Sequence, residues 1–381
     1  MAINATQPLV RPALLAALDI AEAEARSTSI AVEAVLAEAR SRLTENVVAA
    51  AAACMRLSAA QLKKGVFDKR SYQLKRQQSL GLIGELDVLP AVEAALGAEL
   101  ELDLAGRSLR LQEELLSNLV GERLVLECAN SVASSGTWVD VPTLVSAAHL
   151  DCHAPGGLLA LAPRVRVAEL QLEAARKGIE SAQAAQFPTI DLTLGANKVS
   201  ESGSSTFPFP RSSSGGVVGV SVRVPLFASG ALSAKVSEAV AQQDRARGEL
   251  QQQRAKIESE LHVACNQLVG SQLRHQSLRS KEWVGTQQIQ GRSRQRALGA
   301  ADLSAQLDAE ERGLAVREEL ISNWTTYWQA VSRIDAALGR SHATVLEPPT
   351  LTIGLRELAA RDEGRSSHAV RNTGLRLDIG D

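Results

Sequence analysis

The stretch Gly81-Leu-Ile-Gly-Glu-Leu-Asp-Val-Leu89 recurs later in the chain as Gly299-Ala-Ala-Asp-Leu-Ser-Ala-Gln-Leu307. Pro8-Leu9 has a counterpart in Pro225-Leu226, and Leu119-Val-Gly121 corresponds to Ala337-Leu-Gly339. Because the offset between the two copies stays nearly constant along the chain, the match is co-linear. A long unit that occurs twice is typical of one structural unit built twice and packed side by side.

The composition favours long helices. Aromatic residues make up 3% of the 381 residues, and Ala, Leu, Glu, Gln and Arg dominate the long stretches. Such a composition is typical of coiled coils and disfavours a β-sandwich or an α/β enzyme. The net charge is −2, so we expect no nucleic-acid partner.

Four long helices are predicted, two in each copy of the unit. Residues 12–77 and 85–119 are expected to form an antiparallel pair, and residues 231–296 and 302–338 repeat it. Apolar positions in the third helix alternate at spacings of four and three, which is the seam of a coiled coil. The predicted fold class is therefore mainly α, with two long coiled-coil helical hairpins as internal repeats.

Two stretches between the copies alternate like β-strands. In residues 187–196 the apolar side chains fall on one face, and in residues 218–224 four valines alternate with small or polar residues. Strands of about ten residues with one apolar face fit a transmembrane barrel. A soluble hairpin with one buried face fits the same pattern, so periodicity alone leaves both interpretations open.

Three segments resemble the TolC-like outer-membrane efflux and secretion channels. They are Arg164–Thr193, which ends in Gln186-Phe-Pro-Thr-Ile-Asp-Leu-Thr193, then Val224-Pro-Leu-Phe-Ala-Ser-Gly-Ala-Leu232, and the tip sequence Leu86-Asp-Val-Leu89. The resemblance implies a homotrimer whose chains share one β-barrel in outer-membrane lipid and one periplasmic helical tunnel. It also implies docking of the tips on a periplasmic adaptor (membrane fusion) protein, driven by an inner-membrane RND or ABC pump. Export of small molecules or proteins, by efflux or by type I secretion, is the expected function.

The expected organisation follows the repeat. It comprises a first helical-hairpin repeat (1–121), an irregular connector (122–161), a helix leading to the barrel (162–186), a β-hairpin of the barrel (187–226), a second helical-hairpin repeat (227–339) and a disordered tail (340–381).

The repeat also raises an alternative. Alignment of the two copies places Met1 opposite Val218, so the strands before the first repeat are expected to be missing, and no signal peptide is visible. Each chain would then supply two strands and a trimer six, whereas about eight strands already make a barrel filled by its own side chains. The alternative function is a truncated, non-exported coiled-coil scaffold without channel activity.

Asp302 and Asp308 are the candidates for an entrance constriction. The resemblance places Asp308 at one of two acidic positions that narrow the entrance in relatives, and Ala305 stands at the other. Three inward carboxylates would form a ring that attracts cations. The alternative is that they are ordinary acids near a helix N-terminus, favoured by the helix dipole.

Gly81, Leu82, Leu298 and Gly299 are the candidates for adaptor contact, with the glycines allowing a tight turn at each tip. Basic residues precede both tips, and we interpret them as a solvated helix face, with an acidic adaptor surface as the alternative. They are Lys69, Arg70, Lys75, Arg76, Arg292, Arg294 and Arg296.

The remaining polar residues suggest little chemistry. Cys128 and Cys152 lie in the connector and could pair in an oxidising compartment, although free, semi-buried thiols are the simpler interpretation. The sequence His149-Leu-Asp-Cys-His153 is too crowded for a zinc site. No catalytic or cofactor-binding motif is present, so we expect neither an enzyme nor a bound cofactor or metal.

Overall fold

The computed structural model describes residues 2–128, 152, 155–201, 211–300, 302–340 and 351–355. The chain divides into two compact units. The first comprises Met1–Val35 and Gly157–Glu258, and the second comprises Leu36–Gly156 and Ser259–Asp381.

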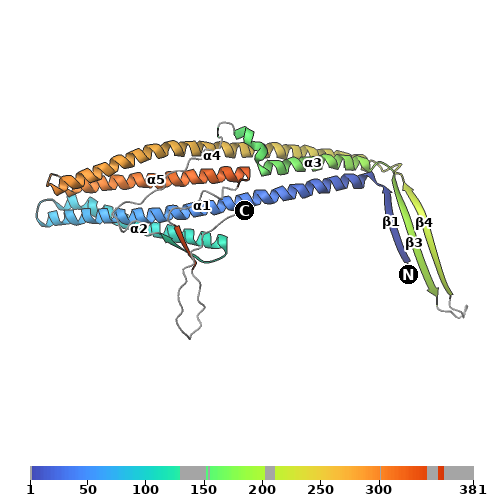
Figure 1. Ribbon diagram of the computed structural model, residues 1–381, viewed down its shortest axis with the longest axis horizontal. Coiled ribbons are helices and arrows are strands. Elements are labelled where there is room, and N and C mark those ends of the chain that lie inside the picture. The colour runs from blue at the N-terminus through green and yellow to red at the C-terminus, as the bar shows by residue number, and fades with distance from the viewer. Residues whose placement is uncertain are drawn as a thin grey trace, which may run out of the picture. The chain divides into compact units, whose positions relative to one another are not determined.

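The second unit contains two antiparallel helical hairpins. One is formed by α1 (Pro12–Ser79) and α2 (Glu85–Val120), the other by α4 (Ala231–Ala297) and α5 (Leu303–Leu338). Within this unit the helices lie side by side in the order α4, α5, α1, α2 (Figure 1). The mainly α-helical fold with two hairpins is confirmed. None of the described helices combines the length and apolarity that a membrane-crossing helix requires.

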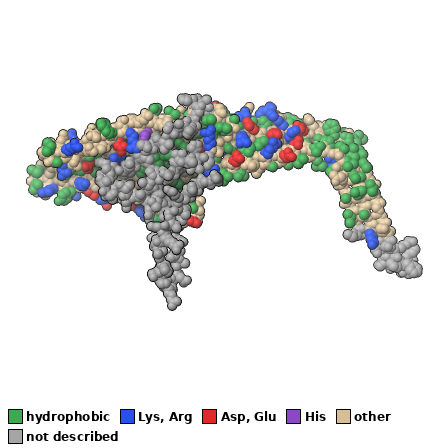
Figure 2. Space-filling model, in the orientation of Figure 1, with side chains coloured by type: hydrophobic (Ala, Val, Ile, Leu, Met, Phe, Trp, Pro, Cys, Tyr) green, Lys and Arg blue, Asp and Glu red, His purple; other side chains and the backbone are tan. Residues whose placement is uncertain are grey.

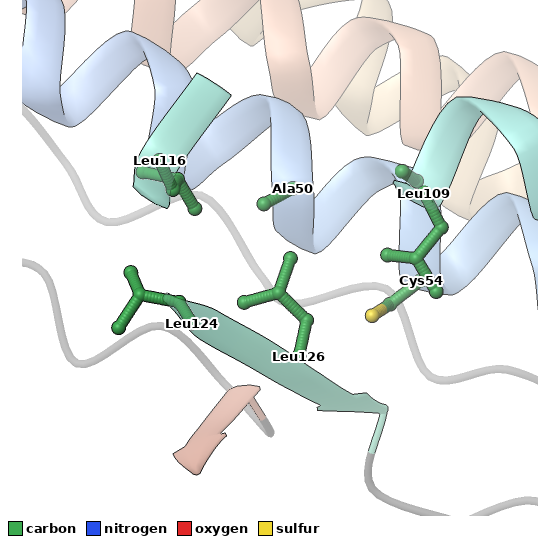
Figure 3. Packing of buried hydrophobic residues seen from close by; sticks show 7 residues of the cluster. Ala50, Cys54, Leu109, Leu116, Leu124 and Leu126 are labelled. Atoms are coloured by element: carbon green, nitrogen blue, oxygen red, sulfur yellow. The ribbon is translucent and has the colours of Figure 1, made fainter. Parts of the chain in front are cut away.

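Small apolar side chains let α1 and α2 approach closely. Ala50 and Cys54 on α1 pack with Leu109 and Leu116 on α2, and the short strand β2 (Leu124–Cys128) covers this cluster (Figure 3). The N–H groups of two β2 residues are satisfied by α2: Leu124 donates to Ser117 Oγ at 2.9 Å and Leu126 to Glu113 Oε1 at 3.0 Å. The helix therefore closes one edge of the strand, which would otherwise be open to pairing.

Two disulfides hold the segment that follows α2. Cys54 on α1 is bonded to Cys128 at the end of β2, with Cα atoms 5.4 Å apart, and Cys152 is bonded to Cys265 on α4, with Cα atoms 5.6 Å apart. The predicted pairing of Cys128 with Cys152, and the interpretation of free thiols, are therefore both wrong. Each connector cysteine instead lies beside a cysteine of a long helix.

The connector and the tail each contain a strand that the sequence analysis did not predict. Strand β2 lies in the connector, and β5 (Leu351–Leu355) lies in the segment that was predicted to be disordered. They pair antiparallel, with Leu124 opposite Leu355 and Cys128 opposite Leu351. The prediction of disorder is thus wrong for β5, because its backbone forms hydrogen bonds with β2, a strand far away in sequence. The other residues of 341–381 lie outside the described part.

The first unit combines helices with a sheet. Besides the first part of α1 and of α4, it contains α3 (Pro163–Ala184), which follows the 3-10 helix η1 (Pro155–Leu161). Lys177 of α3 contacts Asp19 of α1 at 3.6 Å, and Glu169 of α3 contacts Arg254 of α4 at 2.6 Å. Ion pairs on both sides therefore join α3 to the two long helices.

The sheet has three strands in the order β1-β3-β4, all antiparallel. They are β1 (Ala2–Val10), β3 (Thr189–Glu201) and β4 (Arg211–Arg223). The two strands expected from the sequence are therefore too few. The third strand is the N-terminal β1, whose partner β3 lies beyond the whole first helical hairpin and the connector, so no local pattern indicates the pairing.

The register gives the sheet one apolar face. Leu192 lies between Gln7 and Val220, and Leu194 lies between Ala5 and Val218. Val218, Val220 and Val222 are exposed, and Figure 2 shows hydrophobic side chains gathered where the strands meet the helices. On the opposite face Arg11 binds Asp191 through two hydrogen bonds of 2.8 and 2.7 Å, which fixes the start of α1 against β3.

Candidate functional site at the helical tips

The two hairpin tips have the same backbone design. Each ends its first helix with a glycine in the left-handed region, Gly81 at φ 71° and Gly299 at φ 73°. Gly81 N–H donates to the Gln78 carbonyl and Leu82 N–H to the Gln77 carbonyl. Gly299 and Ala300 donate in the same way to the carbonyls of Arg296 and Gln295. Both tips are thus Schellman motifs, at equivalent positions of the two repeats.

The side chains at the tips differ. At the first tip Leu80, Leu82 and Leu86 are 66, 70 and 80% exposed, whereas Leu298 is the large apolar residue exposed at the second tip, at 83%. The second tip is instead preceded by Arg292, Arg294 and Arg296, which the structure leaves exposed as the sequence predicts. One tip thus offers an apolar surface and the other a mainly basic one. Leu82 was a predicted contact residue, whereas Leu80 and Leu86 were not predicted and are equally exposed.

Asp302 caps the N-terminus of α5. Its carboxylate accepts hydrogen bonds from the Leu303 N–H at 2.7 Å, the Ser304 hydroxyl at 2.8 Å and Gln73 Nε2 at 3.3 Å. The hydrogen bond from Ser304 is the main reason why the pKa of Asp302 lies below its ordinary value, and burial acts in the opposite direction. Asp302 therefore has a structural role as an N-cap in addition to any role at an entrance.

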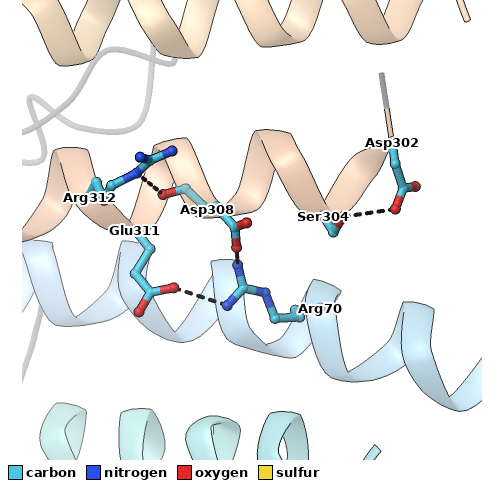
Figure 4. Close-up of polar contacts among 6 residues, drawn as sticks. All are labelled: Arg70, Asp302, Ser304, Asp308, Glu311 and Arg312. Carbon is cyan, nitrogen blue, oxygen red and sulfur yellow. Dashed lines mark hydrogen bonds and ion pairs between the residues drawn. The ribbon is translucent and has the colours of Figure 1, made fainter. Parts of the chain in front are cut away.

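Asp308 is paired with a cation of the other repeat. Its carboxylate binds Arg70 of α1, and the same guanidinium contacts Glu311 at 3.0 Å (Figure 4). Arg70 is also within 5.8 Å of the Phe67 ring centre, and its side chain is 20% exposed. The negative charge of Asp308 is therefore offset by the positive charge of Arg70, so the two side chains together carry no net charge.

The prediction that Arg70 belongs to a solvated basic face is therefore wrong. Arg70 differs from its basic neighbours because it lies where α1 faces α5, a relation that no local sequence pattern reveals. Its two partners, Asp308 and Glu311, come from the opposite repeat. Arg76, by contrast, is exposed and has no ion pair among the described residues.

A second charged cluster lies nearer the middle of the unit. Lys63 of α1 contacts Glu101 of α2 at 2.7 Å and Glu318 of α5 at 3.9 Å. Burial raises the pKa of Glu318 above its ordinary value, while Lys63 opposes the shift. Burial acts to lower the pKa of Lys63, but its carboxylate neighbours raise it. Lys63 thus links the first hairpin, to which it belongs with Glu101, to Glu318 of the second hairpin.

The described residues offer no metal site. No group of three His, Cys, Asp or Glu side chains among them could hold a metal ion. Cys152, part of the crowded cluster in the connector, is bonded to Cys265, which removes it as a thiolate ligand. The two histidines and the aspartate of that cluster lie outside the described residues.

Residues 154–340 match the sequence profile of the outer membrane efflux protein family. Over this span, the chain is similar to the outer membrane efflux protein family. The match contains α3, the strands β3 and β4, and the whole second helical hairpin. It therefore includes the second tip with Leu298, Gly299, Asp302 and Asp308.

Solved structures extend the likeness to the first repeat. The outer-membrane channel OprN is 20% identical, with a TM-score of 0.71 over 89% of this chain and 74% of OprN. The outer membrane protein VceC from Vibrio cholerae is 18% identical, with a TM-score of 0.70 over 89% of this chain and 79% of VceC. CusC is 19% identical, with a TM-score of 0.70 over 89% and 77% of the two chains. At these identities the likeness establishes a shared fold.

Proposed function

We propose that this chain is a subunit of the outer-membrane exit duct of a tripartite efflux pump or type I secretion system. The observation that carries the proposal is the direct passage of the sheet into the repeated helical hairpins. Strand β1 ends at Val10 and α1 begins at Pro12; β4 ends at Arg223 and α4 begins at Ala231. The first helix of each hairpin thus follows a strand that is apolar on one exposed face.

The exposed apolar face fits the lipid-facing side of a barrel shared between copies. Alternation of apolar and polar faces along each strand is the pattern of outer-membrane barrels. Three described strands per chain would give a homotrimer nine, instead of the six expected from the sequence. In this arrangement the polar face, with Thr193 and Asp191, would line the interior.

The helical hairpins would form the periplasmic part, with their tips as the docking region. Hydrophobic contact through Leu80, Leu82 and Leu86 would bind an adaptor protein that is driven by an inner-membrane pump. Asp302 and Asp308 would lie at the entrance. The two disulfides support export, because disulfides persist in oxidising compartments such as the bacterial periplasm and are rare in the cytosol.

Membrane fractionation and gel mobility test the proposal. We expect the full chain in the outer-membrane fraction, as an oligomer of three chains that dissociates to a monomer only after heating in detergent. Recovery only as a monomer in the soluble fraction would contradict it, and would favour the coiled-coil scaffold without channel activity.

A further inference from the structure

The two disulfides join cysteines that follow one another in the chain. Cys54 pairs with Cys128, the next cysteine along the sequence. Cys152 pairs with Cys265, the last one. Four cysteines allow three different sets of two pairs, and this is the one set in which neither pair encloses another cysteine. The order in which the cysteines enter an oxidising compartment is therefore also the order of the pairs.

Chance contacts in an unfolded chain would favour a different pair. Cys128 and Cys152 are 24 positions apart, whereas the native pairs are 74 and 113 positions apart. Because loop closure becomes rarer as about the 3/2 power of loop length, Cys128 meets Cys152 about five times as often as it meets Cys54. Cys152 likewise meets Cys128 about ten times as often as it meets Cys265. Oxidation of the complete unfolded chain would thus produce mainly a bridge that the folded chain does not contain.

The surroundings of Cys54 come from the first repeat and the strand that follows it. Cys54 on α1 is 7% exposed and packs with Leu109 and Leu116 of α2 (Figure 3). The described hydrophobic residues of this cluster all lie between Leu43 and Cys128. Hydrogen bonds between β2 and α2 bring the end of the strand beside α1, where the Cα atoms of the bridged cysteines are 5.4 Å apart. These contacts are therefore available before Cys152 enters the compartment.

A hairpin of neighbouring helices also forms faster than a disulfide. Proteins rich in contacts between such helices fold in microseconds to milliseconds, whereas disulfides form in seconds to hours. The left-handed turn at Gly81 folds α2 back on α1, so the hairpin places Cys54 beside Cys128 before either is oxidised. Formation of this bridge uses up Cys128 and leaves Cys152 with Cys265 as its partner.

We propose that this chain is a substrate of a dithiol–disulfide oxidase in the compartment to which it is exported, and that oxidation follows the order of the chain. Cys54 and Cys128 are joined first. Cys152 and Cys265 are joined second. In each step one cysteine thiolate attacks the disulfide of the oxidase and forms a mixed disulfide. The second thiolate attacks the chain sulfur of that bond and releases the oxidase as a dithiol, so two electrons and two protons pass from the cysteine pair to the oxidase.

This order makes a disulfide isomerase unnecessary, because no non-native bridge has to be broken. The inference rests on export, which is part of the proposed function, and it does not depend on whether the chain acts as a duct.

Two serine variants of the full chain test the order. In Cys54→Ser, Cys128 has no earlier partner, so it should pair with Cys152 and leave Cys265 free, with this bridge about ten times as abundant as the native one. In the matched control Cys265→Ser, Cys54 should pair with Cys128 as in the unaltered chain. Exporting cells are quenched with acid, free thiols are alkylated, and the linked peptides are mapped by mass spectrometry.

The unaltered chain gives a readout that does not depend on how the variants fold. After a short pulse of labelled amino acids, the bridge of Cys54 should appear before the bridge of Cys265, in equal yield in cells with and without a disulfide isomerase. Cells without the oxidase should form neither bridge. A requirement for the isomerase, or a native Cys152–Cys265 bridge beside a free Cys128 in Cys54→Ser, would overturn the order alone. Four reduced cysteines in cells with an active oxidase would overturn the export of the chain, and the proposed function with it.

Discussion

Arg70 on α1 forms an ion pair with Asp308 on α5, so a charged contact links the two helical repeats near their tips. The same guanidinium contacts Glu311, and one cation therefore serves two carboxylates. Asp308, which the sequence suggests for an entrance ring, thus already has a cationic partner within the chain. Any charge that the proposed entrance presents depends on this arginine as much as on the aspartate.

Replacement Arg70→Gln is expected to increase the cation selectivity of the reconstituted channel. The change leaves Asp308 and Glu311 without their shared cation, so each chain adds net negative charge at the proposed entrance. Reversal potentials in planar bilayers under a salt gradient measure the effect. Arg76→Gln makes the same charge change at an exposed position and should give a smaller shift; equal shifts would show that Asp308 does not face the ion path.

Replacement Asp302→Ala is expected to loosen the first turn of α5. Loss of the N-cap costs about 1 kcal/mol, and hydrogen exchange at the amides of residues 303–306 should be faster. Because the pKa of Asp302 lies below its ordinary value of 3.8, this stabilisation is present above about pH 4 and is lost as the pH falls further. Asp302→Asn keeps a good cap, so fast exchange in that variant would show that charge, and not capping, is decisive.

Replacements Gly81→Ala and Gly299→Ala are each expected to destabilise the tips by about 1 kcal/mol, because an L side chain is strained at positive φ. No atom lies within 4 Å of the added Cβ at either position, so the cost comes from the backbone alone. Gly65 in α1 also has open space around it, and Gly65→Ala should stabilise the helix slightly. Similar melting temperatures for all three variants would contradict this account.

Alkylation followed by mass spectrometry tests the two disulfides. We expect no modified cysteine in the unreduced protein and four after reduction and unfolding. The pairs close loops with sequence separations of 74 and 113 residues, and removal of either pair should lower stability by about 2–5 kcal/mol. A peptide joining Cys128 to Cys152 would instead restore the pairing expected from the sequence.

His275 is expected to make stability depend on pH. Burial lowers its pKa, helped by Arg279 and opposed by Glu282. The unfolded chain then binds a proton more readily than the folded one, so stability falls as the pH drops below the ordinary value of 6.5. His275→Gln should remove part of the difference between melting temperatures at about pH 7.5 and about pH 5.5. His262→Gln, a replacement of the same kind at an exposed position of the same helix, is the control variant.

The sequence predicted what depends on local periodicity and on the repeat. The long helices, the tip glycines and the alternating faces of β3 and β4 follow from spacing along the chain. The partners of Arg70 and of the cysteines do not follow from spacing along the chain, because they depend on segments that are far apart in sequence and meet only in the fold. Strand β1 was missed for a similar reason: its hydrogen bonds are made to β3, far away in sequence.

The efflux of a fluorescent substrate from living cells tests the central proposal most directly. Cells that lack this chain are loaded with dye, energised, and compared with the same cells carrying the gene on a plasmid. An exit duct predicts that dye is retained without the chain and released when it is restored. Equal dye release with and without the chain, for every dye tested, would contradict the proposal.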